Sequence, residues 1–94
     1  MAGRFQIFAG SASQALAADI ANAYGAELGK IELRHFKDGE MQPRYEESIR
    51  GNDVFVVQGS QPPADNLMEL LLMVDAAVRA SARSVTVVMP YFCY

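Results

Sequence analysis

Two short runs of β-forming residues constrain this chain most, and the first of them shows no polar alternation. Residues 54–57 are Val-Phe-Val-Val, and residues 84–89 are again mostly apolar. A strand that is exposed on one face alternates, so such runs indicate strands buried on both faces, as in a parallel sheet covered by helices. Between them, a helix is predicted from Asn66 to about Ala82, with an apolar stripe at helical spacing formed by Leu67, Leu70, Leu71, Val74 and Val78. Strand, helix and strand in this order imply a right-handed crossover.

The first half of the chain begins in the same way. Residues 5–8 predict a strand, and an Ala-rich stretch after Gly10 predicts a helix that ends at Gly25. We expect Ser11 or Ser13 to cap this helix, and Asp65 to cap the later one. A loop at a helix N-terminus also attracts anions, but serine is common at caps, so capping is favoured over phosphate binding.

An insertion with a different periodicity separates these two units. Ile31, Leu33 and His35 alternate with more polar residues, and the following Asp38-Gly39 predicts the turn of a hairpin. Its second arm, residues 41–45, contains Pro43, which cannot donate to a sheet ladder. We therefore expect this arm to be an edge strand or to contain a bulge.

Together these elements predict a single partial α/β domain over residues 1–94. Its mainly parallel sheet is flanked by helices, and an antiparallel flap hairpin lies at its side. Ligands of such sheets bind outside the carboxyl ends of the strands. The chain stops at Tyr94, where the loop after the last strand is expected to begin.

The composition excludes several classes of function. Eight Lys and Arg residues against eleven Asp and Glu give a net charge of −3, which argues against a nucleic-acid or membrane partner. The single cysteine, Cys93, excludes an internal disulfide and a Cys-based zinc site. His35 has no second histidine or cysteine nearby, so no metal site is expected. We expect a cytoplasmic protein, since no run approaches the roughly 18 apolar residues of a membrane span.

Two groups of polar residues are candidates for binding. Phe36, Asp38 and Glu40 occupy alternating positions around the hairpin turn, where a ring could stack on a base and two acceptors could bind an amino group or ribose hydroxyls. Ser48 and Arg50 could hold a phosphate. From spacing alone, a solvated surface is the simpler interpretation of both groups.

The second helix is more apolar than one sheet face requires. The surplus residues are Met68, Leu72 and Met73. Their number predicts that this helix is buried on two sides, by another domain or another subunit, and that the chain self-associates.

Several short runs, taken together, resemble one family over nearly the whole chain. They are Phe8-Ala9-Gly10-Ser11-Ala12, Glu27-Leu28-Gly29-Lys30, Phe36-Lys37-Asp38-Gly39-Glu40, Glu46-Glu47-Ser48-Ile49-Arg50-Gly51, Asp65-Asn66-Leu67-Met68-Glu69-Leu70-Leu71, Arg79-Ala80-Ser81-Ala82 and Pro90-Tyr91-Phe92. In order and spacing they resemble the amino-terminal portion of the ribose-phosphate pyrophosphokinases, or phosphoribosyl pyrophosphate synthetases. None of these runs is diagnostic singly.

The resemblance implies an enzyme that transfers pyrophosphate from Mg·ATP to ribose 5-phosphate for nucleotide biosynthesis. It implies a phosphoribosyltransferase-like first domain in a homo-oligomer. Mg²⁺ would bind together with ATP, and none of its protein ligands would lie in this chain. Phe36 would stack on adenine of a neighbouring subunit's ATP, and Asp38 and Glu40 would make its polar contacts. Ser48 and Arg50 would belong to a regulatory site for phosphate or ADP.

The catalytic loop and the acidic ribose-phosphate motif of the family are not found in residues 1–94, so we expect the chain alone to be inactive. Cys93 stands where the family usually has glycine, and Pro43 is unusual in its strand. One alternative is a non-catalytic regulatory homologue or interaction subunit, although the retained Asp38-Gly39-Glu40 turn favours the enzyme. Another is a stand-alone nucleotide-binding half-domain.

Overall fold

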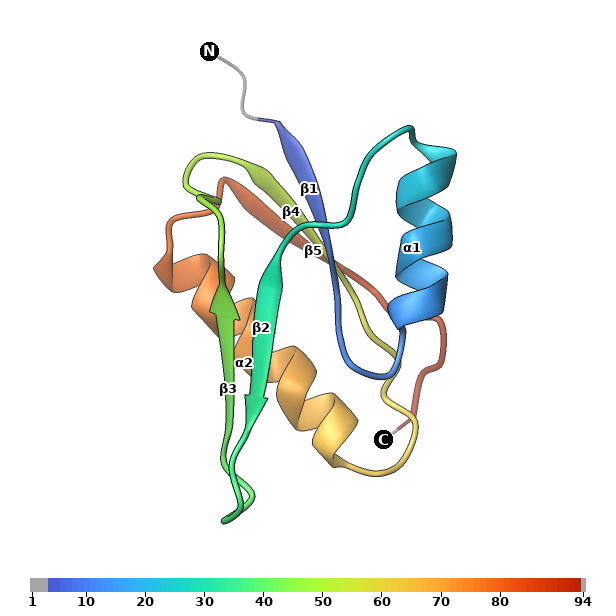
Figure 1. The fold of residues 1–94 in the computed structure, drawn as a ribbon, viewed down its shortest axis with the longest axis vertical. Helices are drawn as coiled ribbons and strands as arrows, with labels where there is room; N and C mark the ends of the chain where they lie inside the picture. Colours follow the sequence, from blue (N-terminus) through green and yellow to red (C-terminus); the bar gives the residue numbers. More distant parts are fainter. Residues whose placement is uncertain (1–3, 94) are drawn as a thin grey trace.

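The chain forms a parallel sheet with a separate antiparallel hairpin (Figure 1). The computed structural model describes residues 4–93. The elements are β1 (Phe5–Ala9), α1 (Gln14–Ala23), β2 (Ile31–His35), β3 (Met41–Tyr45), β4 (Asp53–Val57), α2 (Asp65–Arg79) and β5 (Ser84–Val88). The parallel sheet has the order β1-β4-β5, and β2 pairs with β3. The predicted α/β class with a side hairpin is confirmed. No helix among these residues is long and apolar enough to cross a membrane.

The parallel sheet separates two hydrophobic cores. Alternate residues of each strand face opposite sides, so one face packs against α2 and the hairpin and the other against α1. The larger core contains Phe8, Ile49, Val54, Val56, Leu70, Met73 and Ala77, and the smaller one Ile7, Ala9, Ala17, Ala21 and Val57. The central strand β4 is covered on both faces toward its carboxyl end, as predicted, whereas Asp53 and Phe55 on the α1 face are only partly buried. The prediction for β5 is wrong: it is an edge strand, and none of its residues is fully buried.

The hairpin accommodates Pro43 through its register. Phe36 N donates to Glu40 O at one end of the ladder, and Glu46 N donates to Lys30 O at the other. Hydrogen-bonded pairs alternate along an antiparallel ladder, so Pro43 and its partner Leu33 form a non-hydrogen-bonded pair. The missing N–H of Pro43 therefore costs the ladder nothing. The edge-strand prediction is confirmed, and the pairing is continuous, without a bulge.

The C-terminus of α1 follows the predicted pattern. Gly25 has a φ of +67° and follows the C-cap residue Tyr24. Gly25 N donates to Asn22 O at 3.0 Å, and Ala26 N donates to Ala21 O at 2.8 Å. These two bonds form a Schellman motif, in which glycine is favoured because it adopts the left-handed conformation without strain.

The predicted serine cap is wrong. Ser13 occupies the N-cap position of α1, but its side chain makes no capping bond. Its hydroxyl instead accepts a hydrogen bond from Gly59 N, at 3.0 Å. Ser11 is engaged by α2, as described below, so both serine oxygens connect the β1–α1 loop to other elements.

The bounds of α2 also differ from those predicted. Ala64, rather than Asp65, is the N-cap residue, and the helix ends at Arg79 instead of near Ala82. Ser81 terminates this region with a φ of +66°. It is the only non-glycine residue with positive φ among residues 4–93, so Cys93 needs no glycine-like backbone.

The buried face of α2 matches the predicted stripe only in part, at Leu70 and Val74. Leu71 and Val78 are 54% and 61% exposed, whereas Met73 is completely buried at the centre of the larger core. The helix is oriented so that its buried residues are Glu69, Leu70, Met73 and Ala77. Met73 is therefore not surplus and is not available for the predicted self-association.

Candidate functional site

The carboxyl ends of the three parallel strands meet at one edge of the sheet. Gly10 N donates to Val57 O at 2.9 Å, which joins the loops after β1 and β4. Ser60 N donates to Tyr91 O at 2.8 Å, which joins the loops after β4 and β5. In Figure 1 these loops and the hairpin tip lie toward the same, lower end of the molecule. This edge, residues 10–13, 58–61 and 89–93, is where the topology places ligands.

The loop between β1 and α1 does not leave its first donors open for a phosphate. Ser11 N donates to Glu69 Oε1 at 2.6 Å, and Ala12 N donates to Gln58 Oε1 at 3.1 Å. These two loop amides therefore bind internal side chains, one carboxylate and one amide, and are not free for an external anion. The interpretation of this loop as a phosphate cradle is not supported.

Glu69 is the centre of a buried polar network. The residue is 1% exposed, and its carboxylate accepts hydrogen bonds from Ser11 N, from Ser11 Oγ at 2.8 Å and from Gln58 Nε2 at 3.1 Å. His35 Nε2 lies 2.9 Å from Glu69 Oε2. One carboxylate therefore connects α2, the loop after β1, the end of β4 and the hairpin.

Glu69 was not among the site residues predicted from the sequence. The available signal was its spacing, because Glu69, Met73 and Ala77 lie four residues apart along α2 and share one face. A lone carboxylate on a core face requires buried donors. Its partners Ser11, His35 and Gln58 are distant in sequence, so spacing alone could not identify them.

The three residues predicted to contact a nucleotide lie together on the hairpin turn. Phe36 is 45% exposed, and its backbone closes the turn by donating to Glu40 O and accepting from Gly39 N. Gly39 has a φ of +92°, which favours glycine there. Asp38 Oδ1 accepts a hydrogen bond from Glu40 N at 3.0 Å. The turn thus presents an accessible ring and two exposed carboxylates on a hydrogen-bonded backbone.

Ser48 and Arg50 lie at the other end of the hairpin, in the loop before β4. Both are exposed, and Ser48 O accepts from Gln6 Nε2 at 3.3 Å. No ion pair of Arg50 occurs among residues 4–93. The five residues of β3, roughly 17 Å of extended chain, separate this loop from the turn. The structure therefore does not bring the two predicted sites together.

The base of the hairpin is anchored by Glu47. Its carboxylate accepts hydrogen bonds from Lys30 N, at 2.9 Å, and from Gln6 Nε2. The Lys30 amide, followed by Gln6 and the charge of Arg4, holds the pKa of Glu47 below its ordinary value. This carboxylate therefore fixes the start of β2 against β1.

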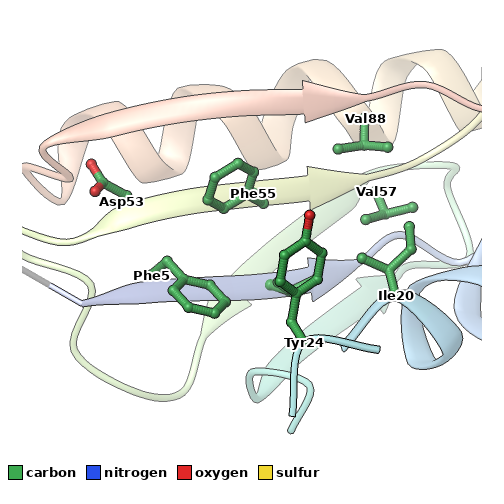
Figure 2. A pocket seen from close by; sticks show the side chains of 8 residues that line it. Phe5, Ile20, Tyr24, Asp53, Phe55, Val57 and Val88 are labelled. Atoms are coloured by element: carbon green, nitrogen blue, oxygen red, sulfur yellow. The ribbon is translucent and has the colours of Figure 1, made fainter. Parts of the chain in front are cut away.

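A separate apolar groove lies on the α1 face of the sheet (Figure 2). It has a volume of about 510 Å³ and is lined by Phe5, Ile7, Ile20, Tyr24, Asp53, Phe55, Val57 and Val88. Its carboxylate, Asp53, is bound by Arg83 and Ser84, which hold the pKa of Asp53 below its ordinary value. The carboxylate of the groove is thus already paired, and the remaining polar side-chain group of its lining is the Tyr24 hydroxyl.

The described residues contain no cluster that fits a protein-bound metal ion. Within residues 4–93, no three His, Cys, Asp or Glu side chains converge as a metal site requires. Asp38 and Glu40 are the two carboxylates of the turn, and Asp38 already accepts a backbone hydrogen bond.

A family model decides the affiliation of this chain. The model of the N-terminal domain of ribose phosphate pyrophosphokinase matches residues 5–94. The chain belongs to this family. The resemblance noted from the short motifs is thereby confirmed.

Relatives in the family are similar along nearly the whole chain. A ribose-phosphate pyrophosphokinase of Porphyromonas gingivalis is 57% identical over 88 residues, covering 94% of this chain and 28% of that protein. Ribose-phosphate pyrophosphokinase 1 of Spinacia oleracea is 54% identical over 92 residues, covering 97% and 27%, respectively. The chain thus spans less than a third of the length of these relatives.

Solved structures agree with the affiliation. Phosphoribosylpyrophosphate synthetase from Mycobacterium smegmatis superposes with a TM-score of 0.87 at 38% identity, over 93% of this chain and 30% of that one. The hypoxanthine-guanine phosphoribosyltransferase of L. donovani superposes with a TM-score of 0.65 at 12% identity, over 93% of this chain and 52% of that one. The second likeness shows a shared fold only and confirms the phosphoribosyltransferase-like architecture.

Proposed function

We propose that this chain forms the N-terminal domain of an enzyme that makes phosphoribosyl pyrophosphate. In that reaction the β,γ-diphosphoryl group of Mg·ATP is transferred to the 1-hydroxyl of ribose 5-phosphate, and AMP leaves. Family membership supports the activity. The observation that supports a role of this chain in the reaction is the hairpin turn, where Phe36 is exposed beside two carboxylates.

The turn has the chemistry needed to contact a nucleoside. The face of Phe36 offers a stacking surface for adenine, and carboxylate oxygens accept hydrogen bonds from an amino group or from ribose hydroxyls. Asp38 is held by Glu40 N, so its second oxygen is oriented before a ligand binds. In a homo-oligomer, this projecting turn would contact ATP held by a neighbouring subunit.

The chain alone is expected to form no phosphoribosyl pyrophosphate. Phosphoryl transfer depends on positioned cations that neutralise the phosphates. At the described carboxyl edge, Ser11, Gln58 and Glu69 instead form a closed network of internal hydrogen bonds. Following the family resemblance, Mg²⁺ would arrive with ATP as part of the substrate, since Mg²⁺ is usually bound through substrate phosphates and only one or two carboxylates.

We further propose that Ser48 and Arg50 contact a regulatory phosphate or ADP. The support is the resemblance together with the exposure of both side chains. Gln6 holds the backbone at Ser48, and a guanidinium can bind a phosphate through two parallel hydrogen bonds. The distance along β3 makes this site separate from the turn.

Because a neighbouring subunit is expected to hold the ATP, the turn is tested by ATP titration of the homo-oligomeric enzyme that contains this domain, followed through backbone amide chemical shifts of the domain. Saturable shifts are expected at residues 35–41, and Phe36→Ala should weaken the apparent affinity by about 5- to 150-fold, as expected for the loss of one stacking contact. Phe5→Ala is the matched control, because Phe5 is similarly exposed, at 46%, but lies away from the turn. Equal responses of the two variants would contradict the assignment.

The same titration with inorganic phosphate or ADP tests the second site. Shifts at residues 46–52 that disappear in Arg50→Gln would support it. A chain that responds only there, with no response at the turn, would favour the non-catalytic regulatory homologue over the enzyme. Formation of phosphoribosyl pyrophosphate by the purified chain would refute its expected inactivity.

A further inference from the structure

Glu69 has an environment that a merely structural side chain does not require. A buried carboxylate is costly unless hydrogen bonds compensate for the lost water. Three of its donors, two from Ser11 and one from Gln58, are neutral and belong to the sheet edge. The remaining partner is His35, which is half exposed and belongs to the hairpin.

The position of His35 gives this contact its significance. His35 is the last residue of β2 and directly precedes Phe36. Farther from the turn, Tyr45 Oη donates to Met73 O at 2.7 Å and anchors the base of the hairpin to α2. Toward the turn, the hydrogen bond between His35 and Glu69 is the corresponding anchor among the described residues.

We propose that Glu69 is a positioning residue for the hairpin turn, acting through His35. This inference rests on the proposed function of the turn in contacting a nucleotide. Glu69 fixes the direction in which Phe36 projects and sets it relative to the β1–α1 loop, because the same carboxylate binds Ser11 N and Oγ. His35 donates through Nε2, since a carboxylate can only accept.

Loss of His35 should change orientation more than stability. Glu69 would keep its bonds to Ser11 and Gln58, so its charge would remain compensated. The neighbouring Arg34 supplies a matched control. It is exposed on the same strand and pairs with Glu32 at 2.7 Å, without contacting Glu69.

The orientation is measurable without any ligand. His35 is the only histidine of the chain, so its ring signals in an NMR spectrum are unambiguous. We expect a slowly exchanging Nε2 proton that shifts when Glu69 is replaced by Gln. Residual dipolar couplings of amides in the hairpin and the parallel sheet should fit one alignment tensor in the parent and in Arg34→Ala, and separate tensors in His35→Ala.

The functional consequence is read from the ATP titration described above. His35→Ala should weaken the response at the turn by roughly tenfold, the size expected for one hydrogen bond to a charged group. His35→Arg should restore it, because a guanidinium also donates to a carboxylate. Arg34→Ala should leave it unchanged.

The outcomes separate this inference from the proposed function. If His35→Ala retains a single alignment tensor, the positioning role of Glu69 is refuted, whatever the nucleotide does. If the tensors separate and the ATP response falls, the inference is supported. If Phe36→Ala leaves the ATP response unaltered, the nucleotide role of the turn fails, and the tensors alone still decide whether Glu69 orients the hairpin.

Discussion

Replacement of Gly29 by alanine tests how the hairpin is attached to the sheet. Gly29 N donates to Ile7 O at 2.7 Å, which holds the segment before β2 against the outer edge of β1. A Cβ atom at this position would lie 2.7 Å from Cδ1 and Cζ of Phe8 and closer still to Cε1. Phe8 has no exposed surface, and its ring packs edge-on against Tyr45 at a centroid distance of 4.7 Å.

The size of the effect follows from this geometry. Because the neighbour is a rigid buried ring, either Phe8 must shift or the bond from Gly29 to Ile7 must lengthen. Overpacking costs about 1–3 kcal/mol, and a weakened hydrogen bond adds about 1 kcal/mol. We therefore expect Gly29→Ala to lower the free energy of unfolding by about 2–4 kcal/mol. For a domain of this size, that loss corresponds to a decrease in Tm of about 8–32 °C.

Gly25→Ala is the matched control for the thermal and urea unfolding experiments. Gly25 lies in the same connection and has nothing within 4 Å of its hypothetical Cβ, but its φ is +67°. Its replacement should cost only the strain of a left-handed alanine, about 1–2 kcal/mol. Phe8→Leu should relieve part of the Gly29→Ala defect in a double-mutant cycle. A Gly29→Ala variant no less stable than Gly25→Ala, or without coupling to Phe8, would refute the reasoning.

Two further substitutions test the anchors of the hairpin by their pH dependence. Burial raises the pKa of Tyr45, so its contribution to stability is present below about pH 10 and is lost as the pH rises. Tyr45→Phe should lose about 1 kcal/mol at neutral pH through the missing bond to Met73 O, and should remove part of the alkaline loss in urea unfolding. The pKa of Glu47 is lowered instead of raised, so its contribution to stability is present at neutral pH and is lost as the pH falls. Glu47→Gln should be less stable than the parent at pH 7, and the difference should shrink below about pH 4; a constant difference would contradict this role.

The elements could be predicted from sequence because their signals are local. The Val54–Val57 run identified a central strand, and Asp38-Gly39 identified the turn. The exposure of β5 could not be predicted in this way, because an apolar run does not reveal whether its strand has a neighbour on each side. The covered face of α2 also depended on where the hairpin packs, and apolar residues on nearly every side of this helix left its rotation ambiguous.

The same distinction between local signals and tertiary packing applies to the candidate site. The residues of the turn are contiguous, so their proximity followed from the hairpin alone. The serines of the β1–α1 loop were correctly located at a helix N-terminus, but their hydrogen-bond partners come from α2 and from the loop after β4. Such pairings are fixed by tertiary packing, which local propensity does not encode.

The difference between non-directional packing and directional hydrogen bonds explains why a buried charge is present at the carboxyl edge. Hydrophobic packing of Phe8, Met73 and their neighbours brings α2 and the hairpin together, but it is non-directional and leaves rotation and sliding weakly specified. Hydrogen bonds to one carboxylate are directional, and those of Glu69 reach Ser11, Gln58 and His35 on three different segments. A well-packed apolar residue at position 69 could match the stability of this network, yet it would not specify the direction of the turn. Glu69 is therefore better explained by the orientation it imposes than by the stability it adds.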